Sequence, residues 1–111
     1  MNLTLLATDD AGLFYQLGTS FGTGPISIGN RQLGLSRDDL LFVSVVGYWP
    51  SIFSGYQGVI DSKGQAQASI NIPNIQALIG YKIHTAFVTL SPSAPSGIKS
   101  ISDTFSFSIT K

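Results

Sequence analysis

The chain has 111 residues, the length of about one domain, and its six basic and six acidic side chains give a formal net charge of zero. This balance excludes the basic surface that binds nucleic acids or draws a protein to anionic membranes. The sequence contains no cysteine, which excludes disulfide bonds and thiolate chemistry.

Hydroxyl side chains supply most of the polarity. The chain has 15 serines and 8 threonines but no glutamate, and charged residues make up only 11% of it, against about 25% in an ordinary domain. Good helix formers such as alanine, lysine and arginine are sparse, whereas residues that suit a pleated sheet are common. The composition therefore favours an all-β protein.

In the N-terminal half, turn residues recur about every 8–12 positions, which is the spacing of a sandwich or barrel. Strands are expected over residues 3–8, 13–19 and around 26–28, the last leading to residues 31–33. The segment 35–40 is expected to form no more than a single helical turn, with Ser36 as its N-cap.

The segment 40–48 is almost continuously apolar. Its length and its valines favour a central strand buried on both faces over a helix. Pro50 follows Trp49 and cannot donate to a β-ladder, so the chain is expected to leave the sheet there.

The C-terminal half shows the clearest alternation of apolar and polar residues, in the segments 65–72 and 104–110. Such alternation is typical of half-buried strands. A hairpin turn is expected at residues 61–64, where Gly64 supplies the positive φ. The strands expected in this half cover residues 56–61, 65–72, 81–90 and 104–110.

These patterns predict a single domain, residues 1–111, folded as an antiparallel β-sandwich, Ig-like or jelly-roll-like. It is expected to contain about seven to nine strands and at most one or two short helical turns. The predicted core consists of Leu41, Val43, Val45, Ile70, Ile72, Phe87, Phe105 and Phe107.

Two features could indicate catalysis. Residues 18–22 read Gly-Thr-Ser-Phe-Gly, the Gly-x-Ser-x-Gly pattern of a nucleophile elbow, but that chemistry needs a helix after the serine, and residues 22–25 would break one. His84 is the only histidine, and in mid-strand it is expected to face solvent or a partner. The sequence predicts no enzyme.

No acidic spacing in the sequence resembles a calcium loop. The pairs Asp9–Asp10 and Asp38–Asp39 are interpreted as a turn acid and a capping acid, although either pair could join a carbonyl around calcium. No metal or cofactor is therefore predicted.

Four aromatic residues cluster around Pro50 and Gly55, and they are the candidate interaction residues: Tyr48, Trp49, Phe53 and Tyr56. Such side chains pack in a core, anchor a protein contact or stack on sugar rings. An exposed planar row would favour sugar, whereas burial in a flat apolar contact would favour protein.

The C-terminal half also carries a run of short motifs: Gly58–Asp61, Gly64–Ala68, Ile72–Asn74, Ala77–Gly80, Ala86–Leu90, Ala94–Gly97 and Ile101–Phe105. This run resembles a β module near the ends of large secreted bacterial proteins, although Asp103 stands where asparagine is common. The resemblance implies a non-catalytic appendage domain that is extracellular or on the cell surface. Residues 1–8 lack the features of a signal peptide, so an export signal is expected elsewhere.

The predicted function is that of a non-catalytic structural or interaction module that binds protein partners or copies of itself. The alternative is a carbohydrate-binding module that uses the loop aromatics. Self-association is expected because the net charge is zero and the terminal strands, 3–8 and 104–110, could lie at sheet edges with few lysines apart from Lys111. Neither nucleic-acid binding nor membrane insertion is expected.

Overall fold

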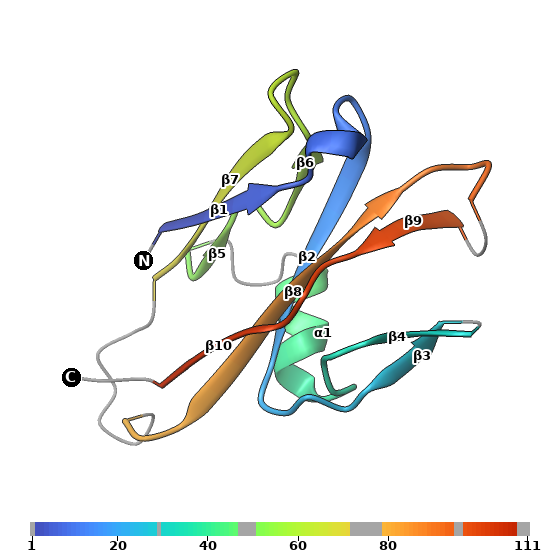
Figure 1. Ribbon diagram of the computed structural model, residues 1–111. Helices are drawn as coiled ribbons and strands as arrows, with labels where there is room; N and C mark the ends of the chain where they lie inside the picture. The colour runs from blue at the N-terminus through green and yellow to red at the C-terminus, as the bar shows by residue number, and fades with distance from the viewer. Residues whose placement is uncertain (1, 29, 47–50, 72–78, 95–96, 109–111) are drawn as a thin grey trace.

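The computed structural model describes residues 2–28, 30–46, 51–71, 79–94 and 97–108. These residues form ten β-strands, one α-helix and one 3-10 turn, and all the strand pairs are antiparallel (Figure 1). The predicted all-β, antiparallel fold is confirmed.

The first sheet has three strands in the order β1-β7-β5. They are β1 (Asn2–Leu6), β7 (Gln65–Ile70) and β5 (Phe53–Ser54). The predicted tight turn precedes β7: the Asp61 carboxylate accepts hydrogen bonds from the backbone N–H groups of Lys63 and Gln65, both at 2.9 Å, and Gly64 has φ +77°. The expected hairpin is wrong, however, because the strands on either side of this turn, β6 and β7, belong to different sheets and do not pair. The turn instead carries the chain from the second sheet to the first.

The second sheet has the order β10-β8-β2-β6, with β9 also paired to β8. Its strands are β2 (Phe14–Ser20), β6 (Gln57–Val59), β8 (Lys82–Leu90), β9 (Ile98–Ile101) and β10 (Phe105–Ser108). Between β9 and β10, Ser102 bridges to β8: its hydroxyl accepts from the Phe87 N–H at 2.8 Å and its own N–H donates to the Phe87 carbonyl at 2.9 Å.

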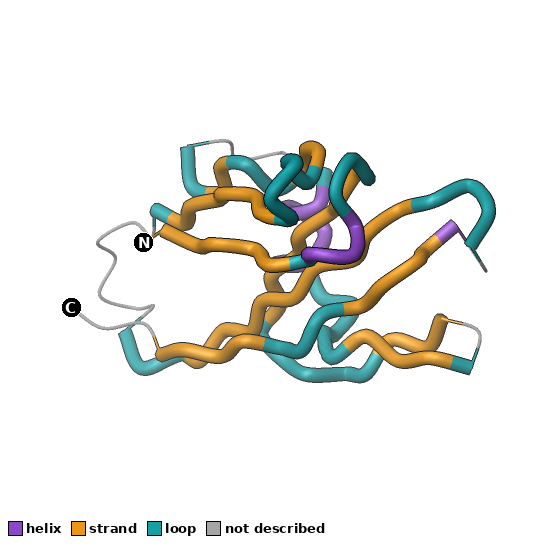
Figure 2. The backbone as a smooth tube through the Cα atoms, turned by 45° about the horizontal axis from the view of Figure 1, so that its top comes forward, coloured by secondary structure: helices purple, strands orange, loops and turns teal. Residues whose placement is uncertain are grey.

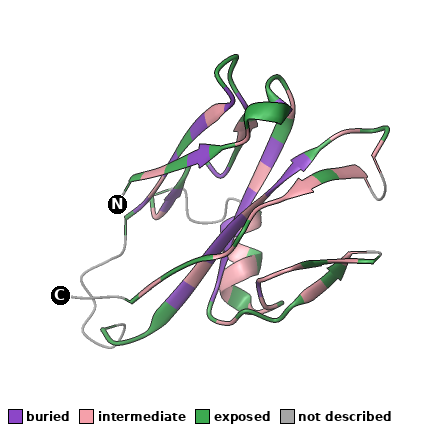
Figure 3. Ribbon diagram, in the orientation of Figure 1, coloured by how far each residue is buried: buried purple, intermediate pink, exposed green. Residues whose placement is uncertain are grey.

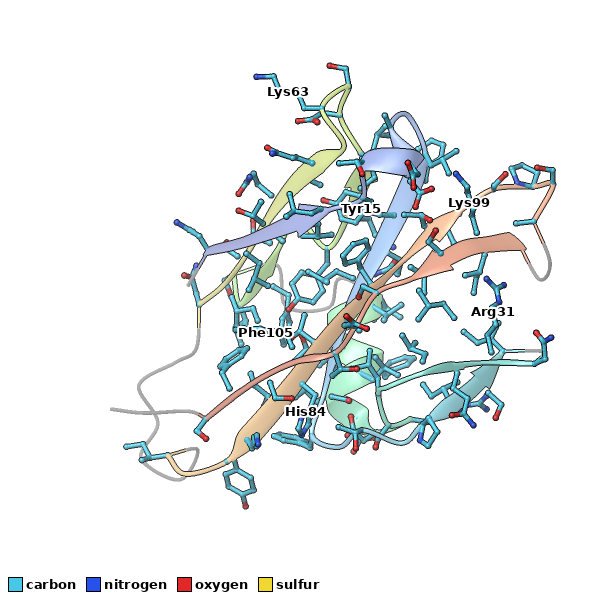
Figure 4. The ribbon with its side chains drawn as sticks, in the orientation of Figure 1. Tyr15, Arg31, Lys63, His84, Lys99 and Phe105 are labelled. Carbon is cyan, nitrogen blue, oxygen red and sulfur yellow. The ribbon has the colours of Figure 1, made fainter. Side chains whose placement is uncertain are left out.

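The β3–β4 hairpin lies on the side of the second sheet that points away from the first (Figure 2), and helix α1 packs against β2 at Gly18. The hairpin consists of β3 (Ile26–Ile28) and β4 (Arg31–Leu33), and Figure 4 shows Arg31 between this hairpin and β9. The Arg31 guanidinium donates to the carbonyls of Ile98 at 2.6 Å and Lys99 at 3.1 Å. The hairpin is thereby tied to the main chain of β9.

The prediction of a central strand over residues 40–48 is wrong, because α1 spans Asp39–Val45. The N-cap is Asp38 rather than Ser36, and its Oδ1 accepts from the Leu41 N–H at 2.9 Å. An apolar segment that contains valines still folds as a helix when tertiary packing favours it. Here Gly18 leaves room for the helix, since a Cβ at that position would lie only 2.8 Å from a Leu41 methyl carbon. Residues 47–50, including Trp49 and Pro50, lie outside the described residues.

The core lies between the two sheets (Figure 3). Its buried residues are Leu5, Tyr15, Leu17, Phe53, Tyr56, Ile60, Ala66, Ala68 and Ile70. Of the predicted core residues, Ile70 is buried, and Leu41, Val43, Val45, Phe87 and Phe107 are half-buried. Phe105 contradicts the prediction, because it is 56% exposed at the border of the second sheet, and Ile72 lies outside the described residues.

Candidate interaction site

The candidate aromatic residues that the structure describes are both inside the core. Phe53 is 6% and Tyr56 5% exposed, and their rings lie 5.1 Å apart at a tilt of 58°. They therefore offer no surface to a partner. Tyr48 and Trp49 lie outside the described residues.

Tyr56 belongs to a buried group of hydroxyls between the sheets. Its hydroxyl lies 2.6 Å from Thr19 Oγ1, which lies 2.9 Å from Thr85 Oγ1. Burial raises the pKa of Tyr56 to about 12, although the hydrogen bonds with Thr19 and Thr85 oppose that shift. The phenol is thus held in its neutral form as part of the core.

Ser20 and His84 are cross-strand neighbours, but their side chains bond elsewhere. The Ser20 hydroxyl donates to the Gly22 carbonyl at 2.6 Å and accepts from the Ser36 N–H at 3.0 Å. His84 Nδ1 lies 2.5 Å from Ser106 Oγ on the outer face of the second sheet. The serine of the Gly-x-Ser-x-Gly pattern therefore shapes a turn, which is followed by β3 rather than by a helix.

Asp10 forms an ion pair that links the two halves of the chain. It is 3% exposed, and its Oδ1 lies 2.6 Å from Lys99 Nζ, while its Oδ2 accepts from Thr89 Oγ1 at 2.9 Å. Burial raises the pKa of Asp10, but hydrogen bonds from Lys99, Ser100 and Thr89 and the charge of Lys99 outweigh that effect and lower it. Lys99 also donates to the Asp9 carbonyl at 2.8 Å, so the amine joins the 3-10 turn (Thr8–Asp10) to β9.

The sandwich is open along the side where β1 faces β9 and β10. A groove of about 420 Å³ lies there, between the β1 residues Asn2–Leu5 on one wall and Ser102, Asp103 and Phe105 on the other. Leu17, Thr85, Ala86 and Phe87 also line it. Figure 4 shows Phe105 on the side of β10 that faces β1. The lining thus combines leucine and phenylalanine side chains with a few hydroxyls.

A second hollow of about 340 Å³ continues this groove along the same side. It is lined by the end of β1, the 3-10 turn and the connection from β9 to β10, and it shares Phe87, Ser102 and Asp103 with the first. The two hollows together follow the whole length of β1.

The backbone of β1 is unpaired on the side that borders this groove. The Ala7 N–H donates to the Gly64 carbonyl at 2.7 Å, directly across the ladder from β1 to β7. Hydrogen-bonding direction alternates along an antiparallel strand, so Leu3 and Leu5 point their backbone groups at β7, and Asn2, Thr4 and Leu6 point theirs away. Within the described part of the chain, no hydrogen bond reaches that outer side of β1.

Sequence reasoning placed the terminal strands at sheet edges, and the sheet order confirms this for β1 and β10. It did not find that both edges border one groove, since that arrangement depends on how the two sheets stack. The signal in the sequence was the alternation of Leu3 and Leu5 with the polar residues Asn2 and Thr4.

An apolar row on the outer face of the second sheet was also missed. Phe14 pairs with Val59 on one side and with Leu90 on the other, and all three side chains are exposed. These residues form a flat patch on β6, β2 and β8, away from the groove.

Comparisons with protein-family models, with curated proteins and with solved structures found no match for this chain. In the part of the chain that the structure describes, no helix is long and apolar enough to cross a membrane.

Proposed function

We propose that this domain is a non-catalytic structural module that associates with protein chains, and first with copies of itself, through the open side of its sandwich. The observation that carries this proposal is the unpaired edge of β1 beside an apolar groove. A location outside the cell is part of the proposal and has only the motifs of the C-terminal half in its support.

A free strand edge next to a groove supports two kinds of contact at once. The main-chain groups of an added strand pair with the edge, and every second side chain of that strand enters the groove. The outer side of β1 offers the pairing groups, and Leu5, Leu17 and Phe87 line the space where the side chains would lie.

Natural sheet edges usually carry devices that prevent such pairing, for example lysines, prolines or bulges. β1 has the sequence Asn-Leu-Thr-Leu-Leu and contains none of these. The zero net charge of the chain adds no long-range repulsion between copies. The edge is therefore chemically suited to association.

The carbohydrate alternative has weaker support. Phe21 and Tyr81 are both exposed, with ring centroids 5.7 Å apart, but the rings are tilted by 55°. A tilted pair offers no planar platform on which a sugar ring stacks.

The test is sedimentation of the wild-type chain over a wide concentration range, beside the variant Thr4→Pro. The Thr4 N–H points away from β7, so proline there removes an edge donor without removing a bond of the β1–β7 ladder. We expect the wild type to associate and Thr4→Pro to weaken association at least about tenfold, because about 1.4 kcal/mol is lost with the donor and the blocked approach.

Thr4→Val is the matched control, since it keeps the N–H and should associate like the wild type. A wild type that stays monomeric at high concentration would contradict the proposal. Association that survives Thr4→Pro but is lost in Phe14→Ser would place the contact on the outer apolar row instead, and would also overturn it.

A further inference from the structure

We infer that the partner at this edge is a second copy of the chain, whose β1 pairs antiparallel with β1 about a twofold axis that passes beside Thr4. This inference rests on the proposed function and specifies its geometry: a closed dimer in which the two three-stranded sheets join into one sheet of six strands, β5-β7-β1-β1-β7-β5.

The hydrogen-bonding groups of β1 determine the register. The outward-facing residues Asn2, Thr4 and Leu6 are evenly spaced about Thr4. An antiparallel pair centred there places Thr4 opposite Thr4 of the second copy, and Asn2 opposite Leu6. Each of these three pairs exchanges two main-chain bonds, which gives about six hydrogen bonds.

The side chains of β1 match this symmetry. Leu3 and Leu5 flank Thr4 and both point inward, so the twofold axis sets each of them opposite a leucine of the other copy. The row of leucines would join the grooves of the two copies, because the half-buried Leu3 lines the same groove as Leu17, Phe87 and Phe105. Leu6, which is 65% exposed, would lie beside the second copy instead of in water.

The other sheet edges are less suited to pairing. β5 has two residues and β6 has three, against five in β1. The carbonyls of Ile98 and Lys99 in β9 already accept from Arg31. The edge of β10 is the main competitor, and the test includes it.

The test uses single cysteines in a chain that has none of its own. In the proposed pairing, the two Thr4 Cα atoms are about 5.5 Å apart, the spacing of a directly opposed hydrogen-bonded pair. A disulfide needs about 4.4–6.8 Å. Mild oxidation of Thr4→Cys should therefore give a covalent dimer on a non-reducing gel, and the linked fraction should follow the dimer fraction found by sedimentation.

Asn2→Cys and Leu6→Cys are the matched controls, because both replace exposed residues of the same strand. Alone, each places its two cysteines about 13 Å apart along the pair, at about 3.3 Å per residue over four residues, and should not link. An equimolar mixture of the two variants should link, since residue 2 of one copy lies opposite residue 6 of the other.

The outcomes separate this inference from the proposed function. If the wild type dimerises and loses the dimer on Thr4→Pro, but neither Thr4→Cys nor the mixture links, the antiparallel register is wrong while the proposed edge stands. Linkage through Ser106→Cys on β10, without linkage through β1, would overturn both. A monomeric wild type would also overturn both.

Discussion

Asp10 shows how one buried carboxylate holds together parts of the chain that lie far apart in sequence. Its two oxygens are taken up by Lys99 and Thr89, which come from β9 and β8. Breaking a buried pair leaves an uncompensated charge, which costs more than the intact pair contributes.

We therefore expect Lys99→Met to lower the free energy of unfolding by about 1–3 kcal/mol, the smaller end reflecting the partial exposure of the lysine. The double variant Asp10→Asn, Lys99→Met should recover part of that loss, because the asparagine side chain has no charge to compensate and can still accept from Thr89. Urea denaturation at neutral pH measures both changes. Equal losses in the single and double variants would contradict this account.

The same ion pair predicts how the stability of the fold changes at acidic pH. The pKa of Asp10 in the folded chain lies below its ordinary value of 3.8, so its contribution to stability is present above that value and is lost as the pH falls through the folded pKa. Asp10→Asn should therefore lose less stability than the wild type between about pH 5 and about pH 2. Urea midpoints at several acidic pH values test this.

The raised pKa of Tyr56 predicts how the stability of the fold changes at alkaline pH. Burial raises its pKa from 10.0 to about 12, so its contribution is fully present below the unfolded value and is lost as the pH rises through the folded one. Stability should fall between about pH 10 and about pH 12, and less steeply in Tyr56→Phe. Burial also raises the pKa of Tyr15, so some decline should remain in the variant.

Tyr56→Phe should in addition cost about 1 kcal/mol at neutral pH, because Thr19 loses one of its two hydroxyl partners. The measurement is the urea midpoint at about pH 8 and about pH 11. Identical alkaline slopes in the two proteins would show that Tyr56 titrates normally.

At the scale of elements, helix α1 depends on one residue before its first turn. Asp38 caps the helix through Leu41 and also accepts from the Phe21 N–H at 2.8 Å, which ties the helix to the end of β2. Further along the helix, the buried Ser44 hydroxyl accepts from the Thr19 N–H at 3.0 Å. Helix α1 therefore supplies a hydrogen-bond partner to the edge of β2 beyond Gln16, the last residue of β2 that pairs with β6.

Asp38→Ala is expected to lower the free energy of unfolding by about 1–2 kcal/mol through loss of both acceptor bonds. Asp39→Ala is the matched control: this acid is the next residue, is exposed and lies in the first turn, so its loss should cost no more than about 0.5 kcal/mol. Thermal or urea denaturation compares them. Similar losses in both variants would mean that the charge near the helix start matters and the cap does not.

The wrong prediction of a strand where α1 lies shows which elements the sequence could predict. Local signals were sufficient where structure is local: the turn at Asp61–Gly64 and the alternation in β7 appear where they were expected. The apolar run after Leu40 was wrongly predicted as a strand, because its state is decided by the close approach of Leu41 to Gly18 and by the hydrogen bond from Thr19 to Ser44. Both contacts exist only in the folded chain. The strand number, expected at seven to nine, is ten in the described residues. The strand expected at 40–48 is a helix, whereas β5 and β9 were not expected, because β5 has only two residues and β9 only four, too few for a clear alternation.

The candidate site was harder to predict for the same reason. For Phe53 and Tyr56 the sequence left core packing, a protein contact and sugar stacking open, and the structure shows core packing. The hydroxyls of Thr19 and Thr85, which are distant in sequence, hold Tyr56 there. The sequence did predict that β1 and β10 are edges. The groove between them follows from the stacking of two sheets, which no local pattern contains.

For the molecule as a whole, the balance of charges predicts how association responds to salt. The chain has no net charge, and the paired strands β1 carry only leucines and the uncharged side chains of Asn2 and Thr4, so salt has little electrostatic attraction to screen at the proposed contact. The dissociation constant of the dimer should change less than about threefold between about 0.05 M and about 0.5 M sodium chloride. Sedimentation at both concentrations measures it, and a tenfold change would indicate a contact between charged groups.

The shortness of β5 and β6 has a further consequence, which polymer chemistry describes well. A monomer with one reactive end forms only dimers, whereas a monomer with two reactive ends forms long polymers. In the proposed dimer, β1 is the long edge of its sheet and is used up by pairing, and β5 at the other side has only two residues, so this sheet would make the domain a monofunctional unit. Lengthening β5 by a few strand-forming residues would make it bifunctional, and the same fold would then propagate its sheet from copy to copy without a natural end.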